Sequence, residues 1–287
     1  MADFWNTDWL TRSEMFAPLR AAASKLPAIG WPDPALLNAI ADDCGRIVNA
    51  RGQLLRFVPQ ARGPQPFEAG FEARAWLRGE VQVRPLDWHD LFNALVWMSF
   101  PSAKAVINAR HCEAMTAPHV TARDAAAVEA ANRPPQRDAL TLFDEDGIVV
   151  LSDDPSLLAL VREFRWKALF RERRAEVRSR MRFLLFGHAL YHKALDPFIG
   201  MTGKGLLVDV PSGYFDLPAR AQVAEADRRL ALRLWDAAPA SGRDLSPVPV
   251  LGVPGWWADN ESATFYDNVE YFRPGRRDKG QAGSPSM

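Results

Sequence analysis

The chain has 287 residues, of which 48% are hydrophobic and 24% are charged, a composition typical of a soluble globular protein. These values exclude wholesale disorder, a collagen-like chain and a coiled-coil rod. Thirty-five basic residues balance thirty-five acidic ones, so no global field draws the whole molecule onto nucleic acid or an anionic bilayer.

Cysteine content and hydropathy indicate the compartment. Two cysteines, Cys44 and Cys112, are too few for a disulfide framework and suit a reducing environment. The acidic start of the chain lacks the positive and apolar regions of a signal peptide. The longest apolar stretches, 91–100 and 183–190, fall short of the roughly 20 residues that a membrane span needs. We therefore expect a cytoplasmic protein that does not enter the membrane.

The first elements alternate between helix and strand. Apolar spacing predicts a helix over 33–51, and an apolar run that stops at Pro59 predicts a strand over 54–58. Over 71–84 the helical period and the strand propensity disagree; we favour two short strands around Gly79.

The middle of the chain contains a helix pair and a hairpin. Asp87 is a capping residue for a helix that runs to about Ser99, and Pro101 begins a second helix. An Ala-rich stretch, 121–132, predicts a weaker helix. Two apolar runs flank the acidic turn 144–147, which ends in Gly, and this pattern predicts a β-hairpin near 140–151.

The last third is again mainly helical. Asp154 opens a helical region that runs to about Leu195 with an interruption near Gly187, followed by a strand over 206–210 and a helix over 217–237. We predict one α+β domain over 1–275, mainly helical with a small antiparallel sheet, and a disordered polar tail over 276–287.

The first candidate site residues lie on the two helices that Pro101 separates. His89 and Asn93 are four residues apart and share a helix face, where the imidazole can act as a base or ligand and the amide can orient a substrate. Lys104, Asn108 and His111 form one stripe on the next helix, a combination that can hold an anion. The alternatives are a satisfied imidazole for His89 and a solvated face for the stripe.

Further candidates come from the acids near the hairpin and from a second histidine segment. Asp138 precedes the acidic turn, where clustered carboxylates can collect a hard cation, although tight turns also favour Asp and Gly. His188 and His192 are four apart, a spacing that lets two imidazoles reach one metal ion. A zinc protease would need Glu after the first histidine, where Ala189 stands. A structural hydrogen bond is the alternative role for His188.

The segment 171–182 carries six arginines against two glutamates and is the one candidate for nucleic-acid contact. Ion pairs on a solvated helix face explain such a pattern as well. No aromatic side chains alternate with the arginines to stack on bases, which argues against nucleic acid.

Several blocks of sequence resemble the bacterial family DUF3025, which is known only as a domain of unknown function. The blocks are Trp88-His89-Asp90-Leu91-Phe92-Asn93-Ala94-Leu95-Val96-Trp97, Arg137-Asp138-Ala139-Leu140-Thr141-Leu142-Phe143-Asp144-Glu145, Gly187-His188-Ala189-Leu190-Tyr191, Pro254-Gly255-Trp256-Trp257 and Phe272-Arg273-Pro274. The resemblance implies a stand-alone bacterial protein and carries no activity, cofactor or residue role with it.

Two functions follow from these patterns. One is a small-molecule enzyme in which His89, Asp138 and His188 are catalytic and Asn93, Lys104, Asn108 and His111 bind the substrate, with a divalent metal as an option. The other is a non-catalytic interaction protein whose arginine-rich face contacts a partner. The sequence determines neither the cofactor nor the oligomeric state.

Overall fold

The computed structural model of the protein describes residues 5–61, 63, 70–116 and 135–275. The expected Ala-rich helix over 121–132 and the tail over 276–287 lie outside these residues. Within them, no helix combines the length and the apolar character that crossing a membrane requires.

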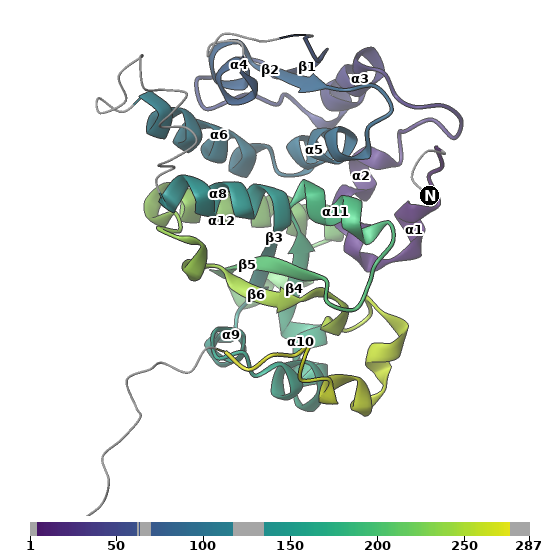
Figure 1. The fold of residues 1–287 in the computed structure, drawn as a ribbon, viewed down its shortest axis with the longest axis vertical. Coiled ribbons are helices and arrows are strands. Elements are labelled where there is room, and N and C mark those ends of the chain that lie inside the picture. The colour runs from purple at the N-terminus through teal and green to yellow at the C-terminus, as the bar shows by residue number, and fades with distance from the viewer. Residues whose placement is uncertain (1–4, 62, 64–69, 117–134, 276–287) are drawn as a thin grey trace, which may run out of the picture.

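A mixed β-sheet lies in the middle of the lower half of the molecule (Figure 1). Its strand order is β4-β3-β5-β6, with β3 parallel to β5 and antiparallel to β4, and β5 antiparallel to β6. The strands are β3 (Gly147–Ser152), β4 (Met181–Leu185), β5 (Thr202–Asp209) and β6 (Ser246–Pro249). Every residue of β3 is buried, because both faces of the sheet are covered.

Helices cover the sheet in layers. On one side α8 (Pro135–Asp146) and α12 (Ala219–Ala237) contact β3 and β5, and beyond them lie α5 (Trp88–Ser99) and α6 (Pro101–Thr116). The contacts of α11 (His188–Ala194) are with α5 and α8. The other side is covered by α9 (Pro155–Arg162), which contacts β3 and β6, and by α10 (Arg174–Arg180), which precedes β4.

A smaller unit completes the molecule above α5 and α6 (Figure 1). It contains two parallel strands with a helix between them, and its elements are α3 (Pro34–Cys44), β1 (Arg56–Pro59), α4 (Phe71–Arg78) and β2 (Glu80–Val83). The chain starts with the short helices α1 (Trp9–Arg12), η1 (Glu14–Leu19) and α2 (Arg20–Ala23). Short turns of helix lie between the strands of the sheet, namely a π-helical turn (Ala168–Glu172), η4 (Ser212–Asp216) and η5 (Gly242–Asp244), and others follow its last strand, namely η6 (Val250–Gly252), η7 (Ala258–Glu261) and η8 (Ala263–Asp267).

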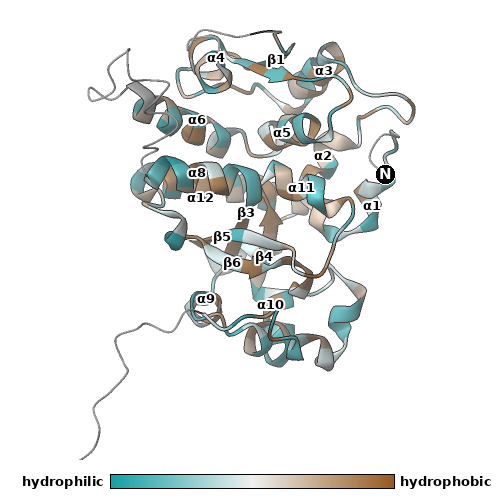
Figure 2. Cartoon of the chain, in the orientation of Figure 1, coloured by the Kyte–Doolittle hydropathy of each residue, from teal (hydrophilic) through white to brown (hydrophobic). Residues whose placement is uncertain are grey.

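One hydrophobic cluster runs through these layers. It includes residues of the upper unit such as Phe57, of the helix layer such as Phe92, and of the sheet such as Val149, all at most 1% exposed. Figure 2 shows the strands as mostly hydrophobic and the outer helices as mixed, as expected for a sheet covered on both faces. The Trp256–Trp257 segment packs against this core, with Trp256 buried and Trp257 partly buried.

The α+β class predicted from the sequence is confirmed, but the hairpin near 140–151 is wrong. Its first arm belongs to α8, because Ala139, Leu140 and Phe143 recur at helical spacing and bury one face of that helix. Only the second arm is a strand, β3. The sheet is not purely antiparallel either, because β3 and β5 run parallel.

Two further segments differ from the prediction. Of the two strands expected around Gly79, the second forms as β2, but residues 71–78 form the helix α4, which ends at Gly79 in the left-handed conformation. The expected helical region over 154–195 is broken by β4, because the apolar residues 181–185 pair with β3 along a buried ladder. His188 therefore begins a new short helix instead of continuing a long one.

Candidate metal centre

His89 is held at the start of α5. Asp87 caps this helix, as predicted, by accepting a hydrogen bond from the backbone N–H of Asp90 at 3.0 Å. Trp88 is buried against the indoles of Trp5, Trp9 and Trp31, whose ring centroids lie 4.8–6.2 Å from its own. The capped turn and the anchored indole fix the backbone on both sides of His89.

Glu145 lies at the last turn of α8, where the helix gives way to β3. The buried face of α8 packs Phe143 onto Phe186, with ring centroids 4.9 Å apart. Asp144 is buried, whereas the Glu145 side chain is 38% exposed. The two neighbouring carboxylates therefore have different surroundings, one inside the protein and one at its surface.

His188 reaches Glu145 through a close contact of two backbones. The N–H groups of Phe186 and Gly187 both donate to the carbonyl of Gly147 at 2.9 Å. A Cβ atom on Gly187 would collide with the carbonyl of Glu145 and the backbone nitrogen of Gly147. Only glycine allows this approach, and it places the first residue of α11, His188, beside the end of α8.

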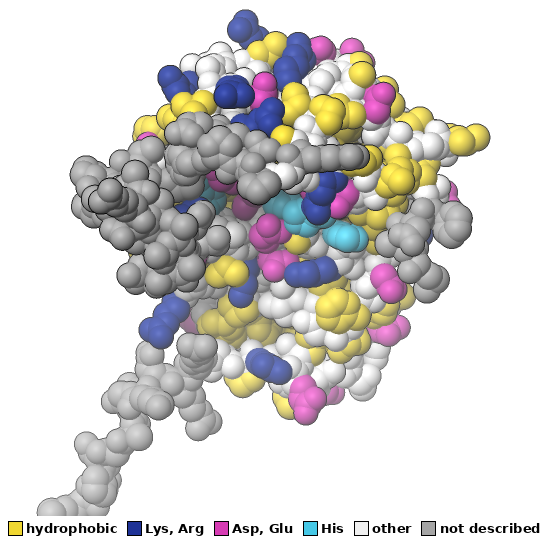
Figure 3. All heavy atoms as spheres, turned by 45° about the horizontal axis from the view of Figure 1, so that its top comes forward, with side chains coloured by type: hydrophobic (Ala, Val, Ile, Leu, Met, Phe, Trp, Pro, Cys, Tyr) yellow, Lys and Arg dark blue, Asp and Glu magenta, His cyan; other side chains and the backbone are white. Residues whose placement is uncertain are grey.

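The three side chains converge on one carboxylate oxygen. The Nε2 atom of His89 lies 3.2 Å from Oε2 of Glu145, and Nε2 of His188 lies 3.4 Å from the same oxygen. The two imidazole rings are nearly perpendicular, with centroids 4.4 Å apart. On the face drawn in Figure 3, histidine side chains reach the surface among acidic and basic side chains.

These separations match those between ligand atoms around a metal ion. Metal–ligand bonds of about 2.0–2.1 Å in a tetrahedral site place neighbouring ligand atoms about 3.3 Å apart. The ligand atoms of His89, Glu145 and His188 all lie within 4.8 Å of one another. His89 and Glu145 are each about a third exposed, so further ligands have access from solvent.

The outward nitrogens of the two imidazoles face carboxylates, as they do in many metal sites. Nδ1 of His89 lies 3.3 Å from Oδ1 of Asp90. Nδ1 of His188 lies 3.8 Å from Oδ2 of Asp144, too far for a hydrogen bond, and has no hydrogen-bond partner among the described residues. Each Nε2 atom is thereby directed at Glu145.

Lys104 holds Asp144 in place from α6. Its Nζ donates to Oδ1 of Asp144 at 2.6 Å, in a pair whose side chains are 3% and 12% exposed, and lies 5.4 Å from the centroid of the Trp97 ring. Burial alone would raise the pKa of Asp144, but the charges of Lys104 and His188 outweigh it and hold the pKa below the usual range. Asp144 is therefore a buried anion.

The imidazoles and carboxylates of this group shift one another's pKa values. Hydrogen bonds to Asp90 and then to Glu145 raise the pKa of His89 to about 9. Burial alone would raise the pKa of Glu145, but hydrogen bonds from His188 and His89 hold it well below its usual value. Without a metal, the ionised carboxylate of Glu145 lies between two imidazoles. A cation that binds to these three groups would replace a proton on an imidazole.

A second group of possible ligands shares His89 with the first and comprises Asp87, His89 and Asp90. Arg84 already pairs with both acids, at 3.2 Å from Asp87 and 2.7 Å from Asp90. Arg84 neutralises part of their charge, whereas the ion pairs of Glu145 with the described residues are made to imidazoles. The group of His89, Glu145 and His188 is the better cation site.

The structure brings together His89 and His188, as the sequence-based pairing of these two residues anticipated. Asp138 is exposed in the first turn of α8, and the acids beside the histidines are Asp90, Asp144 and Glu145 instead. The expected pairing of His188 with His192 gives way to pairing between helices, because His188 contacts α5 and α8 residues.

The four predicted substrate-binding residues are all buried, at 4% exposure or less. Lys104 reaches the centre through Asp144, and His111 contributes to the charge that lowers the pKa of Asp144. Asn108 donates to Glu72 of α4. Asn93 lies one turn after His89, and its Oδ1 has no hydrogen-bond partner in the described part of the chain.

Glu145 is the functional candidate that the sequence analysis missed. Its acidic neighbours and Gly147 suggested a tight turn, and that interpretation accounted for the carboxylates by conformation alone. A signal was nevertheless present, since the helical spacing of Ala139, Leu140 and Phe143 places Glu145 at a helix end.

Fold and site together define an α+β protein with a two-histidine, one-carboxylate centre between its helix layers. The chain belongs to the family described as protein of unknown function DUF3025, whose model matches residues 55–276. That range contains His89, Glu145 and His188, and each comes from one of the sequence blocks that resemble the family. No curated protein and no solved structure gives a significant match.

Proposed function

We propose that this protein is a divalent-metal-dependent enzyme acting on a small-molecule substrate, with His89, Glu145 and His188 as the metal ligands. The observation that carries the proposal is the convergence of two Nε2 atoms on one carboxylate oxygen at 3.2 and 3.4 Å. The ligand atoms of these three side chains all lie within 4.8 Å of one another, a grouping that lets them surround a single cation and so supports a metal ion over separate structural hydrogen bonds.

The set of donor atoms narrows the choice of metal ion. Two imidazole nitrogens and one carboxylate oxygen suit zinc or ferrous iron, whereas magnesium and calcium prefer oxygen ligands alone. Three protein ligands leave coordination positions for water and substrate, as in catalytic rather than structural zinc sites. A metal bound in this way acidifies its water and polarises a carbonyl or phosphoryl oxygen.

The surrounding residues have separate roles in this proposal. Asp90 orients the imidazole of His89, the buried carboxylate of Asp144 faces Nδ1 of His188 as a charge, and Lys104 fixes Asp144. Asn93 is the candidate for a polar contact with the substrate, because its amide oxygen is unpaired one turn from His89. Asp138, at the surface of the first turn of α8, is no longer the preferred catalytic acid; Glu145 replaces it in our proposal.

The alternative of a nucleic-acid-binding face has less support. Along α10, Arg173, Arg174 and Arg178 pair with glutamates, and Arg180 pairs with Asp153 and Asp154. Charges that are already paired attract phosphates weakly. The two cysteines are free in the structure, and a bacterial cytoplasm remains the environment that we propose.

Elemental analysis of protein purified without a metal-affinity tag tests the proposal. We expect about one equivalent of zinc or iron per chain, lost in His89→Ala, Glu145→Gln and His188→Ala. The matched control is His192→Ala, which removes a histidine one turn later on α11 that is not part of the group. A parent protein that binds no divalent metal, even after incubation with zinc or ferrous salts, would refute the metal centre.

Activity is tested separately with metal-loaded protein and chromogenic acyl and phosphate esters. Hydrolysis that is lost in Glu145→Gln and kept in His192→Ala would support hydrolytic chemistry. A metal that binds stoichiometrically without such turnover would restrict the proposal to the other reactions of such centres.

A further inference from the structure

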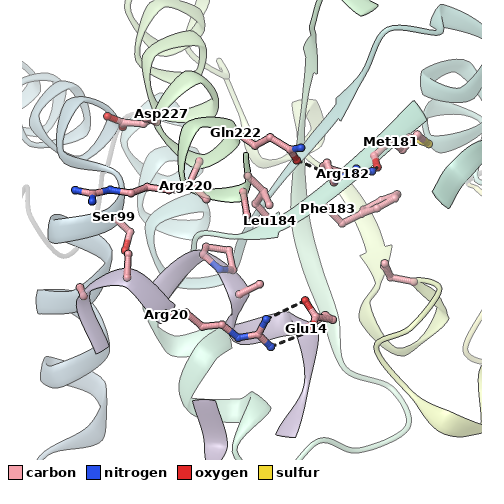
Figure 4. A pocket seen from close by; sticks show the side chains of 18 of the residues that line it. Glu14, Arg20, Ser99, Met181, Arg182, Phe183, Leu184, Arg220, Gln222 and Asp227 are labelled. Carbon is pink, nitrogen blue, oxygen red and sulfur yellow. Dashed lines mark hydrogen bonds and ion pairs between the residues drawn. The ribbon is translucent and has the colours of Figure 1, made fainter. Parts of the chain in front are cut away.

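A cavity of about 850 Å³ opens on another part of the molecule, where elements far apart in the sequence meet. Its walls come from η1 and α2, from the junction of α5 and α6, from α10 and β4, and from the first half of α12. Figure 4 shows this cavity with Leu184 and Phe183 of β4 at its centre. None of the three proposed metal ligands lines it.

The floor of the cavity is apolar. Met98, Phe183 and Leu184 are 7–8% exposed and present that small remainder to the cavity that they line. Val223 and Trp256 extend the apolar surface at its sides. A floor of this kind favours the apolar body of a ligand, because each square ångström removed from water stabilises the complex.

The charged side chains around the floor are four arginines and two acids. Both acids are already engaged. Glu14 accepts two hydrogen bonds from Arg20, at 3.0 and 3.1 Å. Asp227 accepts the backbone N–H groups of Ser102 and Ala103 at the start of α6, at 3.0 and 2.8 Å.

Two of the arginines have no acidic partner within the described part of the chain. Arg182 donates to Oε1 of Gln222 and to backbone carbonyls, all neutral acceptors. Arg220 is exposed and makes no hydrogen bond or ion pair with the described residues. In Figure 4 these two arginines lie on either side of Leu184. The cavity therefore combines an apolar floor with uncompensated positive charge.

We propose that this cavity binds an amphipathic carboxylate of small-molecule size, whose apolar body lies on Phe183 and Leu184 and whose carboxylate pairs with Arg220 or Arg182. The volume lies within the range of about 300–1,000 Å³ typical of small-molecule sites. Guanidinium groups bind carboxylates through paired hydrogen bonds, which favours this anion over a neutral ligand. This inference does not depend on the metal centre.

The arginine-rich segment 171–182 thereby has a function other than nucleic-acid contact. Arg178 and Arg182 line the cavity, and the guanidinium of Arg182 is held 5.1 Å from the Phe215 ring centroid. A fixed guanidinium loses little side-chain freedom when a ligand binds.

Isothermal titration calorimetry with octanoate tests the proposal, with octan-1-ol and octylammonium as neutral and cationic probes of the same chain length. We expect saturable binding of octanoate and at least about tenfold weaker binding of octylammonium. Arg220→Gln should weaken octanoate binding by about two- to fivefold and leave octan-1-ol binding unchanged. Val223→Trp should abolish binding of both by filling the cavity.

Two control variants outside the cavity test whether octanoate binds there. Arg165→Gln removes an exposed arginine that does not line the cavity and should change nothing. His188→Ala should keep octanoate binding, so a failure of the metal proposal leaves this one standing. Absence of saturable octanoate binding, equal affinity for octylammonium, or unchanged binding in a folded Val223→Trp variant would each overturn it.

Discussion

Charged side chains are arranged differently at the metal centre and along α10. At the centre, His188, Asp144 and Lys104 are buried, at 3–12% side-chain exposure, and each depends on one or two partners. Along α10, the arginines themselves are exposed, at 44–56% for Arg178 and Arg180; Arg178 pairs with the exposed Glu261, and Arg180 pairs with Asp153 and Asp154. The first region contains fewer charges than the second but removes them from water.

This difference in burial indicates which region can bind an ion more strongly. A buried group has lost its hydration and gains much from a well-placed ion, because water does not compete. An exposed ion pair contributes little, because solvent screens it and replaces either partner readily. Charge density alone therefore favours α10, whereas burial combined with incomplete pairing favours the proposed metal centre.

The largest effect is expected for Lys104→Met, which leaves Asp144 as a buried charge with no ammonium partner. Breaking a buried pair from one side costs about 3–5 kcal/mol. Denaturant unfolding of the metal-free protein measures this loss as a fall in the midpoint concentration.

Lys193 supplies the matched control on the surface. It pairs with Asp146 at the same 2.6 Å, but its side chain is 45% exposed. Lys193→Met should cost less than about 1 kcal/mol. Equal losses in the two variants would show that burial does not distinguish the two regions.

The second largest effect is expected for Gly187→Ala, which disturbs the backbone contact between Gly187 and Glu145. Gly187→Ala places a methyl group against the carbonyl of Glu145, and relief of such overpacking costs about 1–3 kcal/mol. The displacement separates His188 from Glu145, so the variant should also lose its metal. Gly213→Ala is the control, since nothing lies within 4 Å of a Cβ built there. Normal metal content in Gly187→Ala would mean that the centre does not need this contact.

A smaller effect is expected for Asp90→Asn, which removes the carboxylate that orients His89. Loss of such a partner lowers metal affinity by about 10–100-fold. Arg84→Gln is informative beside it, because it removes the other ion-pair partner of Asp90 and leaves the contact with His89 in place. Competition with a zinc-binding dye should show weaker binding in Asp90→Asn and equal or stronger binding in Arg84→Gln. The opposite order would remove Asp90 from the centre.

The fold was predictable where local signals and burial agree. The cap at Asp87 and the proline at 101 marked α5 and α6, since capping and proline act within one helical turn. The region 140–151 was misjudged because a short apolar run fits a helix face as well as a strand. The parallel pairing of β3 with β5 joins residues about 57 positions apart, which no local pattern reveals.

The proposed metal centre was partly predictable, again because local signals can be read from the sequence and long-range contacts cannot. A histidine on an apolar helix face needs a partner, and the sequence offered His89 or Asp138 as the partner of His188. It could not choose among acids, because the choice depends on how α8 ends and on the contact of Gly187 with Glu145. The stripe of Lys104, Asn108 and His111 was expected to hold an anion or to face solvent, but α4 and α8 pack on α6 and all three residues are buried.

The smallest effect is expected at the other region, in Arg180→Gln. Arg180 pairs with Asp153 at 3.0 Å and with Asp154 at 2.8 Å, yet its side chain is 44% exposed and Arg173 also pairs with Asp154. Because Arg173 remains beside Asp154 and water solvates the Arg180 guanidinium, the free energy of unfolding should fall by no more than about 1 kcal/mol. The loss should shrink further in 1 M salt, where charges are screened over about 3 Å. Denaturant unfolding at low and high salt measures both changes. A loss as large as that of Lys104→Met, or one that salt does not reduce, would place Arg180 in a buried network and remove the contrast between the two regions.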